Sequence, residues 1–207
     1  MELLKGDDLA AIVEQRRAIP PVEVVGLLHQ AALALDRTHA AGVVHRDLKP
    51  ENLFVTTRDD GSPRLKVLDF GIAKVTAQGA SAKTTRSLGT PLYMAPEQIM
   101  AKKDIGPAAD LYAMGHIAYT LLAGEAYWAR EATAHDGIFP FFQEVMQGAR
   151  QRPTDRARER GERAKLEDFR FQVETAHKQH TTTVCFKRGD RWFPDQVLDE
   201  GECADAR

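Results

Sequence analysis

The sequence predicts a mainly helical domain with one small β-hairpin, an α+β arrangement. Residues 21–40 repeat apolar side chains at the spacing of a helix, and residues 107–124 are apolar on nearly every side of one. Between them, two short apolar runs flank the turn-rich sequence DDGSP at 59–63, which is typical of a hairpin. A chain of 207 residues with 43% hydrophobic content can bury one core around these elements.

Composition argues against several classes of protein. The 28 basic residues are balanced by 30 acidic ones, so the chain has no electrostatic signature of a nucleic-acid partner. The sequence MELLKGDDLA lacks the cations and the apolar run of a signal peptide, and no apolar stretch is long enough to span a bilayer. Cys185 and Cys203 have no CxxC spacing and predict neither disulfides nor a thiolate zinc site. We therefore expect a cytoplasmic protein without membrane insertion.

Two helices are predicted in the first 40 residues. After the acids at 7 and 8, which can cap a helix, apolar residues recur at helical spacing and predict a short helix to about Gln15. The segment Pro21–Ala40 starts with a residue suited to the first helical position and is followed by Gly42, a common helix stop. Its apolar face, which includes His39, predicts a long and largely buried helix.

The sequence HRDLKPEN at 45–52 is expected to be a loop, because Pro50 does not fit inside a helix. Residues Leu53–Thr56 and Leu65–Leu68 are the predicted strands of the hairpin. The stretch 72–90 has no sustained apolar period and predicts a long loop. Loops of that length inside a compact domain are usually functional.

The C-terminal half is less regular. Pro107 opens the helix that we place in the centre of the core, and Phe139–Val145 predicts a further short helix. From Arg150 to Arg170 charges dominate, and we expect a solvent-exposed surface there. The tail at 180–197 favours a pair of strands that turns at Gly189.

The groups needed for phosphoryl transfer occur close together in the sequence. This reaction requires a hydroxyl held in line with the terminal phosphate and cations placed where negative charge develops. Asp47 can accept the proton of an incoming hydroxyl, and Lys49 can neutralise the transferring phosphate. Asn52 and Asp69 offer the hard oxygen ligands that Mg²⁺ prefers, and the hairpin can bring them together.

Several motifs together resemble the C-terminal lobe of eukaryotic-type protein kinases, which occur in eukaryotes and bacteria. These motifs are HRDLKPEN, DFG at 69–71, GTPLYMAPE at 89–97 and DLYAMG at 110–115, in the family's order and at sensible spacing. The resemblance covers residues 1–150, from the hinge to the helix G region, and leaves 151–207 as a charged segment and divergent tail of unknown fold. Lys49 together with Gly-Thr at 89–90 looks like the serine/threonine branch. ATP and Mg²⁺ are the cofactors that this resemblance implies, and a protein with a Ser or Thr hydroxyl is the substrate.

The resemblance also assigns catalytic roles residue by residue. Asp47 would be the catalytic base, Lys49 the cation that faces the phosphate, and Asn52 and Asp69 the metal ligands. Thr90 would touch Asp47 and the substrate hydroxyl.

Regulatory and structural roles are implied in the same way. Arg46 would pair with a phosphorylated activation loop, and Asp110 would hold the backbone of the catalytic loop. The candidate phosphate acceptors are Thr84, Thr85 and Ser87. Packing or structural roles are expected for His45, Phe70, Gly71 and Glu97.

The start of the chain looks like the hinge of a kinase. Backbone groups of Glu2 and Leu4 would meet the adenine, Asp8 would meet the ribose, and Phe54 would form the floor under the base. No GxGxxG sequence is present, and Lys5 is the only lysine ahead of His45. We therefore expect a truncated kinase whose N-terminal lobe is missing from this sequence, with weak nucleotide binding by the C-terminal lobe alone, and a separate chain as one possible source of the missing lobe.

The C-terminal end departs from the family as well. Glu97 normally pairs with a late arginine in this family, and no such arginine can be aligned here, unless the charged run supplies one. Our first hypothesis is a serine/threonine protein kinase. The alternatives are a noncatalytic, pseudokinase-like binding module, which would hold a partner without turnover, and an inert fragment of a broken gene.

Overall fold

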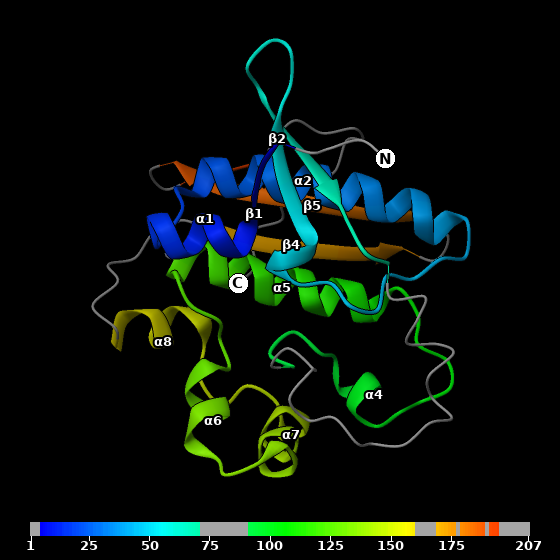
Figure 1. The fold of residues 1–207 in the computed structure, drawn as a ribbon, viewed down its shortest axis with the longest axis vertical. Coiled ribbons are helices and arrows are strands. Elements are labelled where there is room, and N and C mark those ends of the chain that lie inside the picture. Colours follow the sequence, from blue (N-terminus) through cyan, green and yellow to red (C-terminus); the bar gives the residue numbers. More distant parts are fainter. Residues whose placement is uncertain (1–4, 71–90, 160–168, 177–178, 189–190, 195–207) are drawn as a thin grey trace.

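The computed structural model describes residues 5–70, 91–159, 169–176, 179–188 and 191–194 (Figure 1). Two long helices, α2 (Pro21–Ala40) and α5 (Ala108–Ala123), pack against each other and carry most of the core. A small sheet of three strands lies against this pair, and the shorter C-terminal helices gather below α5 in the view of Figure 1. The predicted mainly helical α+β class is confirmed.

The two long helices agree with the sequence prediction. α2 begins at Pro21, ends at Ala40 and is followed by Gly42 in a left-handed conformation with φ 76°. α5 buries residues on nearly every side, as its uniformly apolar sequence predicts. Leu28 and Ile117 are among the fully buried side chains of their shared core.

The first sheet has the strand order β1–β2–β3 and is antiparallel throughout. The predicted hairpin is confirmed as β2 (Leu53–Thr57) and β3 (Pro63–Val67), with Leu53 opposite Val67. The edge strand β3 is tied to α2 by Gln30, whose Oε1 accepts the Leu65 N–H at 3.1 Å. The Gln30 side chain thus satisfies a backbone N–H group that an edge strand would otherwise leave without a hydrogen bond.

Strand β1 (Gly6–Asp8) was not predicted, because three residues GDD carry no strand signal of their own. Pairing with β2 makes it a strand, with Gly6 opposite Thr56 and Asp8 opposite Phe54. Gly6 has φ 143°, and a Cβ there would lie 2.0 Å from the Val55 carbonyl oxygen. This position therefore requires glycine.

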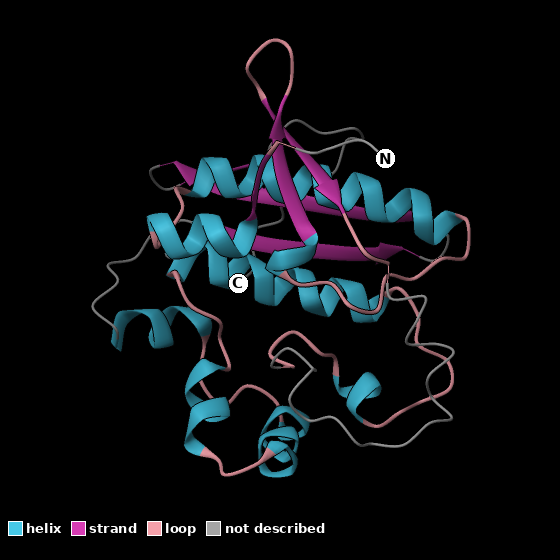
Figure 2. Ribbon diagram, viewed as in Figure 1, coloured by secondary structure: helices cyan, strands magenta, loops and turns pink. Residues whose placement is uncertain are grey.

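The shorter helices were predicted in part (Figure 2). The predicted helices near the N-terminus and around 139–145 are confirmed, whereas the others were missed because each has only one or two turns. The helices are α1 (Leu9–Arg16), α4 (Pro96–Ile99), α6 (Ala129–Ala134), α7 (Ile138–Gln147) and α8 (Pro153–Glu159), with a 3₁₀ turn η1 at Pro50–Asn52.

A second antiparallel sheet follows near the C-terminus, with the order β4 (Phe169–Ala176), β5 (Gln179–Arg188) and β6 (Arg191–Pro194). Strand β5 contacts α2. The pairing of β5 with β6 agrees with the predicted strand pair, although Gly189 itself lies outside the described residues. Strand β4 was missed even though FRFQV alternates apolar and polar residues, which is the pattern of a strand.

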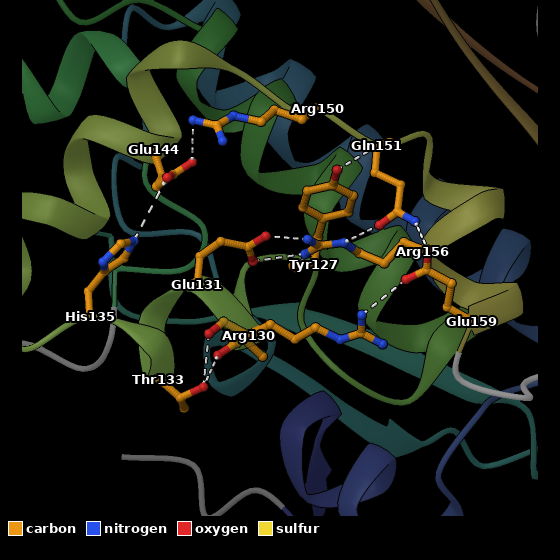
Figure 3. A network of polar contacts seen from close by, with 11 residues as sticks. Tyr127, Arg130, Glu131, Thr133, His135, Glu144, Arg150, Gln151, Arg156 and Glu159 are labelled. Carbon is orange, nitrogen blue, oxygen red and sulfur yellow. Dashed lines mark hydrogen bonds and ion pairs between the residues drawn. The ribbon is translucent and has the colours of Figure 1, made fainter.

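Arg156 of α8 corrects the expectation that the charged run is all solvent-exposed (Figure 3). Arg156 is 7% exposed, forms a bidentate ion pair with Glu131, donates to the backbone oxygen of Tyr127 and lies 4.2 Å from the centroid of the Tyr127 ring. The side chains of Arg150 and Arg152 are 67% and 85% exposed, as expected. A guanidinium can be buried where a carboxylate and hydrogen bonds satisfy it, so Arg156 closes α8 onto α6.

Candidate active site

Asp110 on α5 holds the backbone at the start of HRDLKPEN. Its carboxylate is fully buried and accepts the His45 N–H at 2.8 Å and the Arg46 N–H at 2.9 Å. Nε2 of His39 on α2 lies 2.7 Å from the same carboxylate. A buried carboxylate is tolerated when its oxygens are hydrogen-bonded. The Asp110 side chain thus connects the two core helices, α2 and α5, to the loop.

His45 connects this loop to the end of the hairpin. The residue is fully buried, its Nε2 lies 2.9 Å from the Leu68 carbonyl oxygen, and its Nδ1 lies 3.3 Å from the Asp47 amide nitrogen. An imidazole with its proton on Nε2 satisfies both contacts, because Nε2 then donates and Nδ1 accepts. The Phe70 ring packs on it at 4.7 Å between ring centroids.

Asn52 links the two sequence segments that would ligate a metal. Its side-chain Nδ2 donates to the Asp47 backbone carbonyl oxygen at 2.7 Å, and its backbone carbonyl oxygen accepts the Leu68 N–H at 2.8 Å. Asp69 follows Leu68 in the chain, so the hairpin brings the backbone of Asp69 near that of Asn52.

The donor set around Asn52 and Asp69 fits Mg²⁺ rather than a metal with an all-protein cage. Among the described residues, no group of three or more His, Cys, Asp or Glu side chains could hold a metal ion. With Nδ2 of Asn52 used for Asp47, its Oδ1 and the Asp69 carboxylate are the candidate ligands. Mg²⁺ usually takes one or two protein ligands and completes its shell with phosphates and water.

Two residues of the site adopt a backbone conformation that is unusual outside glycine. Arg46 has φ 64° and Asp69 has φ 51°. Such residues persist only where their surroundings enforce them, and they concentrate at functional sites. Both positions belong to the motifs that the sequence singled out.

The expected nucleotide side is described in part. Asp8 and Phe54 are register partners in β1 and β2, so the sheet brings these two candidates together. Asp8 also caps α1, because its Oδ1 accepts the Ala11 N–H at 2.8 Å. Lys49 is extended, with φ −159° and ψ 163°, as expected before Pro50.

The segment after the predicted activation loop is anchored at two points. The Tyr93 hydroxyl lies 3.2 Å from Thr120 Oγ1 on α5, and burial raises the pKa of Tyr93 to about 12. Gln98 donates from Nε2 to the Arg46 carbonyl oxygen at 2.7 Å. Glu97 forms no ion pair within the described part of the chain, and Arg156, the buried arginine of the charged run, pairs with Glu131 instead.

Two residues with site contacts were missed from the sequence. His39 was assigned to the buried face of its helix, and a buried histidine requires a polar partner, but the sequence did not identify Asp110 as that partner. Gln98 was not singled out, although a glutamine three residues after the N-cap position of a helix is typical of a capping box.

Several predicted site residues lie outside the described residues, so their positions are not tested. These are Glu2, Leu4, Gly71, Thr84, Thr85, Ser87 and Thr90.

A cavity of about 420 Å³ lies beside the Arg156 network and is separate from the catalytic loop. Of its charged lining residues, Arg150 pairs with Glu144 at 3.1 Å and Arg156 pairs with Glu131, whereas Arg130 pairs with Glu159 outside the lining. None of the sequence-predicted site residues is among those that line it, which are Tyr127, Trp128, Arg130, Glu131, Ala134, His135, Glu144, Arg150, Gln151 and Arg156.

The fold and the loop geometry define a protein of the kinase class. The family described as Protein kinase domain matches residues 1–199, and the chain belongs to this family. Its relatives include bacterial serine/threonine kinases, in agreement with the resemblance inferred from the motifs.

Two curated relatives illustrate the match. Serine/threonine-protein kinase Pkn1 of Myxococcus xanthus is 46% identical over 136 residues, which cover 65% of this chain and 19% of Pkn1. Serine/threonine-protein kinase PknL of Mycobacterium tuberculosis is 34% identical over 174 residues, which cover 75% of this chain and 42% of PknL. The chain therefore spans less than half the length of these relatives.

Among solved structures, the fold is similar to that of Rad53 residues 1–466 in complex with AMP-PNP. The TM-score is 0.56 at 24% sequence identity, and the match covers 76% of this chain and 37% of the Rad53 chain. This likeness supports the kinase fold. Within the described residues, no helix is both long enough and apolar enough to cross a membrane.

Proposed function

We propose that this chain provides the catalytic loop of a protein kinase that transfers a phosphoryl group from ATP to a Ser or Thr hydroxyl. One observation carries the proposal: the backbone around Asp47 is held by side chains from several directions. His45 accepts the Asp47 N–H, Asn52 donates to the Asp47 carbonyl oxygen, and Asp110 holds the preceding residues. A rigidly placed carboxylate is what a positioned general base requires.

In this proposal Asp47 accepts the proton of the substrate hydroxyl while the hydroxyl oxygen bonds to the γ-phosphorus and the bond to the ADP oxygen breaks. Lys49 offsets the negative charge that develops on the transferring group. Asn52 Oδ1 and the Asp69 carboxylate hold Mg²⁺, which supplies charge neutralisation at the phosphates. Thr90 contacts Asp47 and the substrate hydroxyl.

The remaining assignments extend the same proposal. Adenine contacts come from the backbone of Glu2 and Leu4, Asp8 binds the ribose, and Phe54 lies under the base. Arg46 pairs with a phosphate on the activation loop, for which the acceptor candidates are Thr84, Thr85 and Ser87. The groups that cover the phosphates come from another part of the protein or from another chain. ATP, Mg²⁺ and the cytoplasmic location expected from the sequence belong to this proposal.

The experiment is a phosphoryl-transfer assay with labelled ATP, Mg²⁺ and a generic Ser/Thr protein substrate. It uses the full chain with and without a kinase N-terminal lobe supplied in trans. Asp47→Asn removes the base and should reduce transfer by at least about a hundredfold. Asp59→Asn, in the exposed turn of the hairpin, is the matched control and should retain full transfer.

Two outcomes would reject the catalytic proposal. One is the absence of transfer under both conditions, and the other is transfer that Asp47→Asn leaves unchanged. A partner that binds wild type and Asp47→Asn equally well, with no turnover, would instead support the noncatalytic binding module.

A further inference from the structure

Gln98 makes contacts with two different segments through its side-chain amide. It lies on the first turn of α4, where its Oε1 accepts the Ala95 N–H at 3.1 Å. Its Nε2 donates to the Arg46 carbonyl oxygen at 2.7 Å, across 52 positions of sequence. One contact caps the helix, and the other reaches the catalytic loop.

The Arg46 carbonyl oxygen belongs to the peptide group that joins Arg46 to Asp47. Because a peptide group is planar, fixing its oxygen also fixes the direction of its N–H. That N–H belongs to Asp47 and points to His45 Nδ1 at 3.3 Å. Gln98 and His45 thus bind the two opposite ends, C=O and N–H, of the planar peptide group that precedes the Asp47 Cα.

The neighbouring peptide groups are held in the same manner. Asp110 accepts the N–H groups of His45 and Arg46, and Asn52 donates to the carbonyl oxygen of Asp47. The backbone from residue 45 to residue 47 is therefore fixed at successive peptide groups. Gln98 adds a hydrogen bond from α4, the helix that begins with the last two residues of the GTPLYMAPE motif.

Arg46 needs such restraint, because its φ of 64° is unfavourable for a residue with a Cβ. Its N–H is held by Asp110, its carbonyl oxygen by Gln98, and its guanidinium donates to the Ile105 carbonyl oxygen at 3.3 Å. Loss of one of these contacts would let the backbone relax toward common conformations and would turn the Asp47 side chain.

We propose that Gln98 is a positioning residue for Asp47, acting through the peptide group between Arg46 and Asp47. The inference rests on the proposed kinase function and adds a residue to it. It couples α4 to the orientation of the catalytic carboxylate. A purely structural role would limit Gln98 to capping α4.

Two substitutions separate these roles. Gln98→Ala removes both contacts. Gln98→Glu keeps an oxygen that can accept the Ala95 N–H, but it replaces the donor to Arg46 with an acceptor that repels the carbonyl oxygen. Gln143→Ala, at an exposed position of α7, is the matched control for a glutamine in a helix.

The first readout is amide hydrogen exchange, resolved by NMR on the full chain, which requires no activity. In Gln98→Ala, the Ala95 amide loses its acceptor and should exchange about tenfold faster. The Asp47 amide should exchange faster by a similar factor, because release of the Arg46 carbonyl oxygen weakens the hydrogen bond from the Asp47 N–H to His45 Nδ1. In Gln98→Glu, the Ala95 amide should stay protected while the Asp47 amide becomes faster. Protection of Asp47 that is unchanged in Gln98→Glu would overturn the proposal, as would an equal change in Gln143→Ala.

The second readout is steady-state kinetics under the conditions that support phosphoryl transfer. Gln98→Glu should lower kcat about tenfold and leave the KM for ATP within about twofold, because a misplaced base affects the chemical step. A kcat equal to that of the wild type would overturn the positioning role. If every variant, including wild type, fails to transfer phosphate, the proposed function fails, and the exchange experiment still decides whether Gln98 holds the Asp47 peptide group.

Discussion

The Asp110 carboxylate and the Arg46 amide form a 2.9 Å hydrogen bond across 64 positions of sequence. This contact joins the most buried helix of the domain to a loop residue with a left-handed backbone. Because Asp110 is fully buried, its oxygens depend entirely on protein donors.

Replacing Asp110 should therefore destabilise the domain as well as the loop. In Asp110→Asn the new amide nitrogen faces backbone N–H donors, so at least one buried donor loses its acceptor. We expect the free energy of unfolding to fall by about 3 kcal/mol, measured by urea denaturation. Asp59→Asn in the exposed hairpin turn should change it by less than about 0.5 kcal/mol. Equal stability of the two variants would contradict this account of Asp110.

The Arg156–Glu131 pair should be worth more than the surface pairs of the same region. Arg156→Ala leaves the Glu131 carboxylate without its partner and removes the contact with Tyr127, and we expect a loss of about 3 kcal/mol. Arg130→Ala breaks an exposed pair with Glu159 and should cost about 0–1 kcal/mol. Denaturant midpoints of the two variants provide the comparison, and similar midpoints would show that the burial of Arg156 contributes little.

His116 should make stability depend on pH in the mildly acidic range. Burial lowers the pKa of His116 to about 4. The centroid of its ring lies 4.5 Å from that of the Tyr112 ring and 5.7 Å from that of the Tyr127 ring. Between the ordinary histidine pKa of about 6.5 and pH 4, the unfolded chain binds a proton that the folded chain excludes. Stability therefore falls as the pH falls through this window, by about 3 kcal/mol in total.

The measurement is the free energy of unfolding of wild type and His116→Phe at several pH values. Phenylalanine keeps an aromatic ring in the cluster and cannot titrate. The difference between the two proteins should be constant above pH 7 and should grow in favour of the variant as the pH is lowered toward 4. A difference that does not change with pH would show that His116 is not responsible.

Two glycines should respond in opposite ways to the same substitution. Gly6→Ala places a Cβ against the Val55 carbonyl oxygen in a backbone conformation that excludes side chains, so it should destabilise by about 2 kcal/mol or more. Gly26→Ala, in α2 with nothing within 4 Å of the new Cβ, should stabilise by about 1 kcal/mol. Thermal unfolding of both variants tests the pair, and destabilisation by Gly26→Ala would indicate a contact that the structure does not show.

The elements predicted from the sequence are those whose signal is local. α2, α5 and the β2–β3 hairpin follow from apolar periodicity, a proline at a helix start and turn residues, all of which act within a few positions. The same local reading missed β1, because GDD becomes a strand only by pairing with β2. Local patterns also predicted that Arg156 is solvent-exposed, because the Glu131 carboxylate that makes its burial possible lies 25 positions away in the sequence.

The sequence by itself determined the family and the identity of the candidate catalytic groups, because HRDLKPEN and DFG carry their residue types in contiguous order. The tertiary structure decided how these groups are held. His39 reaches Asp110 across 71 positions and Gln98 reaches Arg46 across 52. Such contacts leave no periodic trace in the sequence, since they form only when packing brings distant segments together, and they fix the backbone from which Asp47 extends.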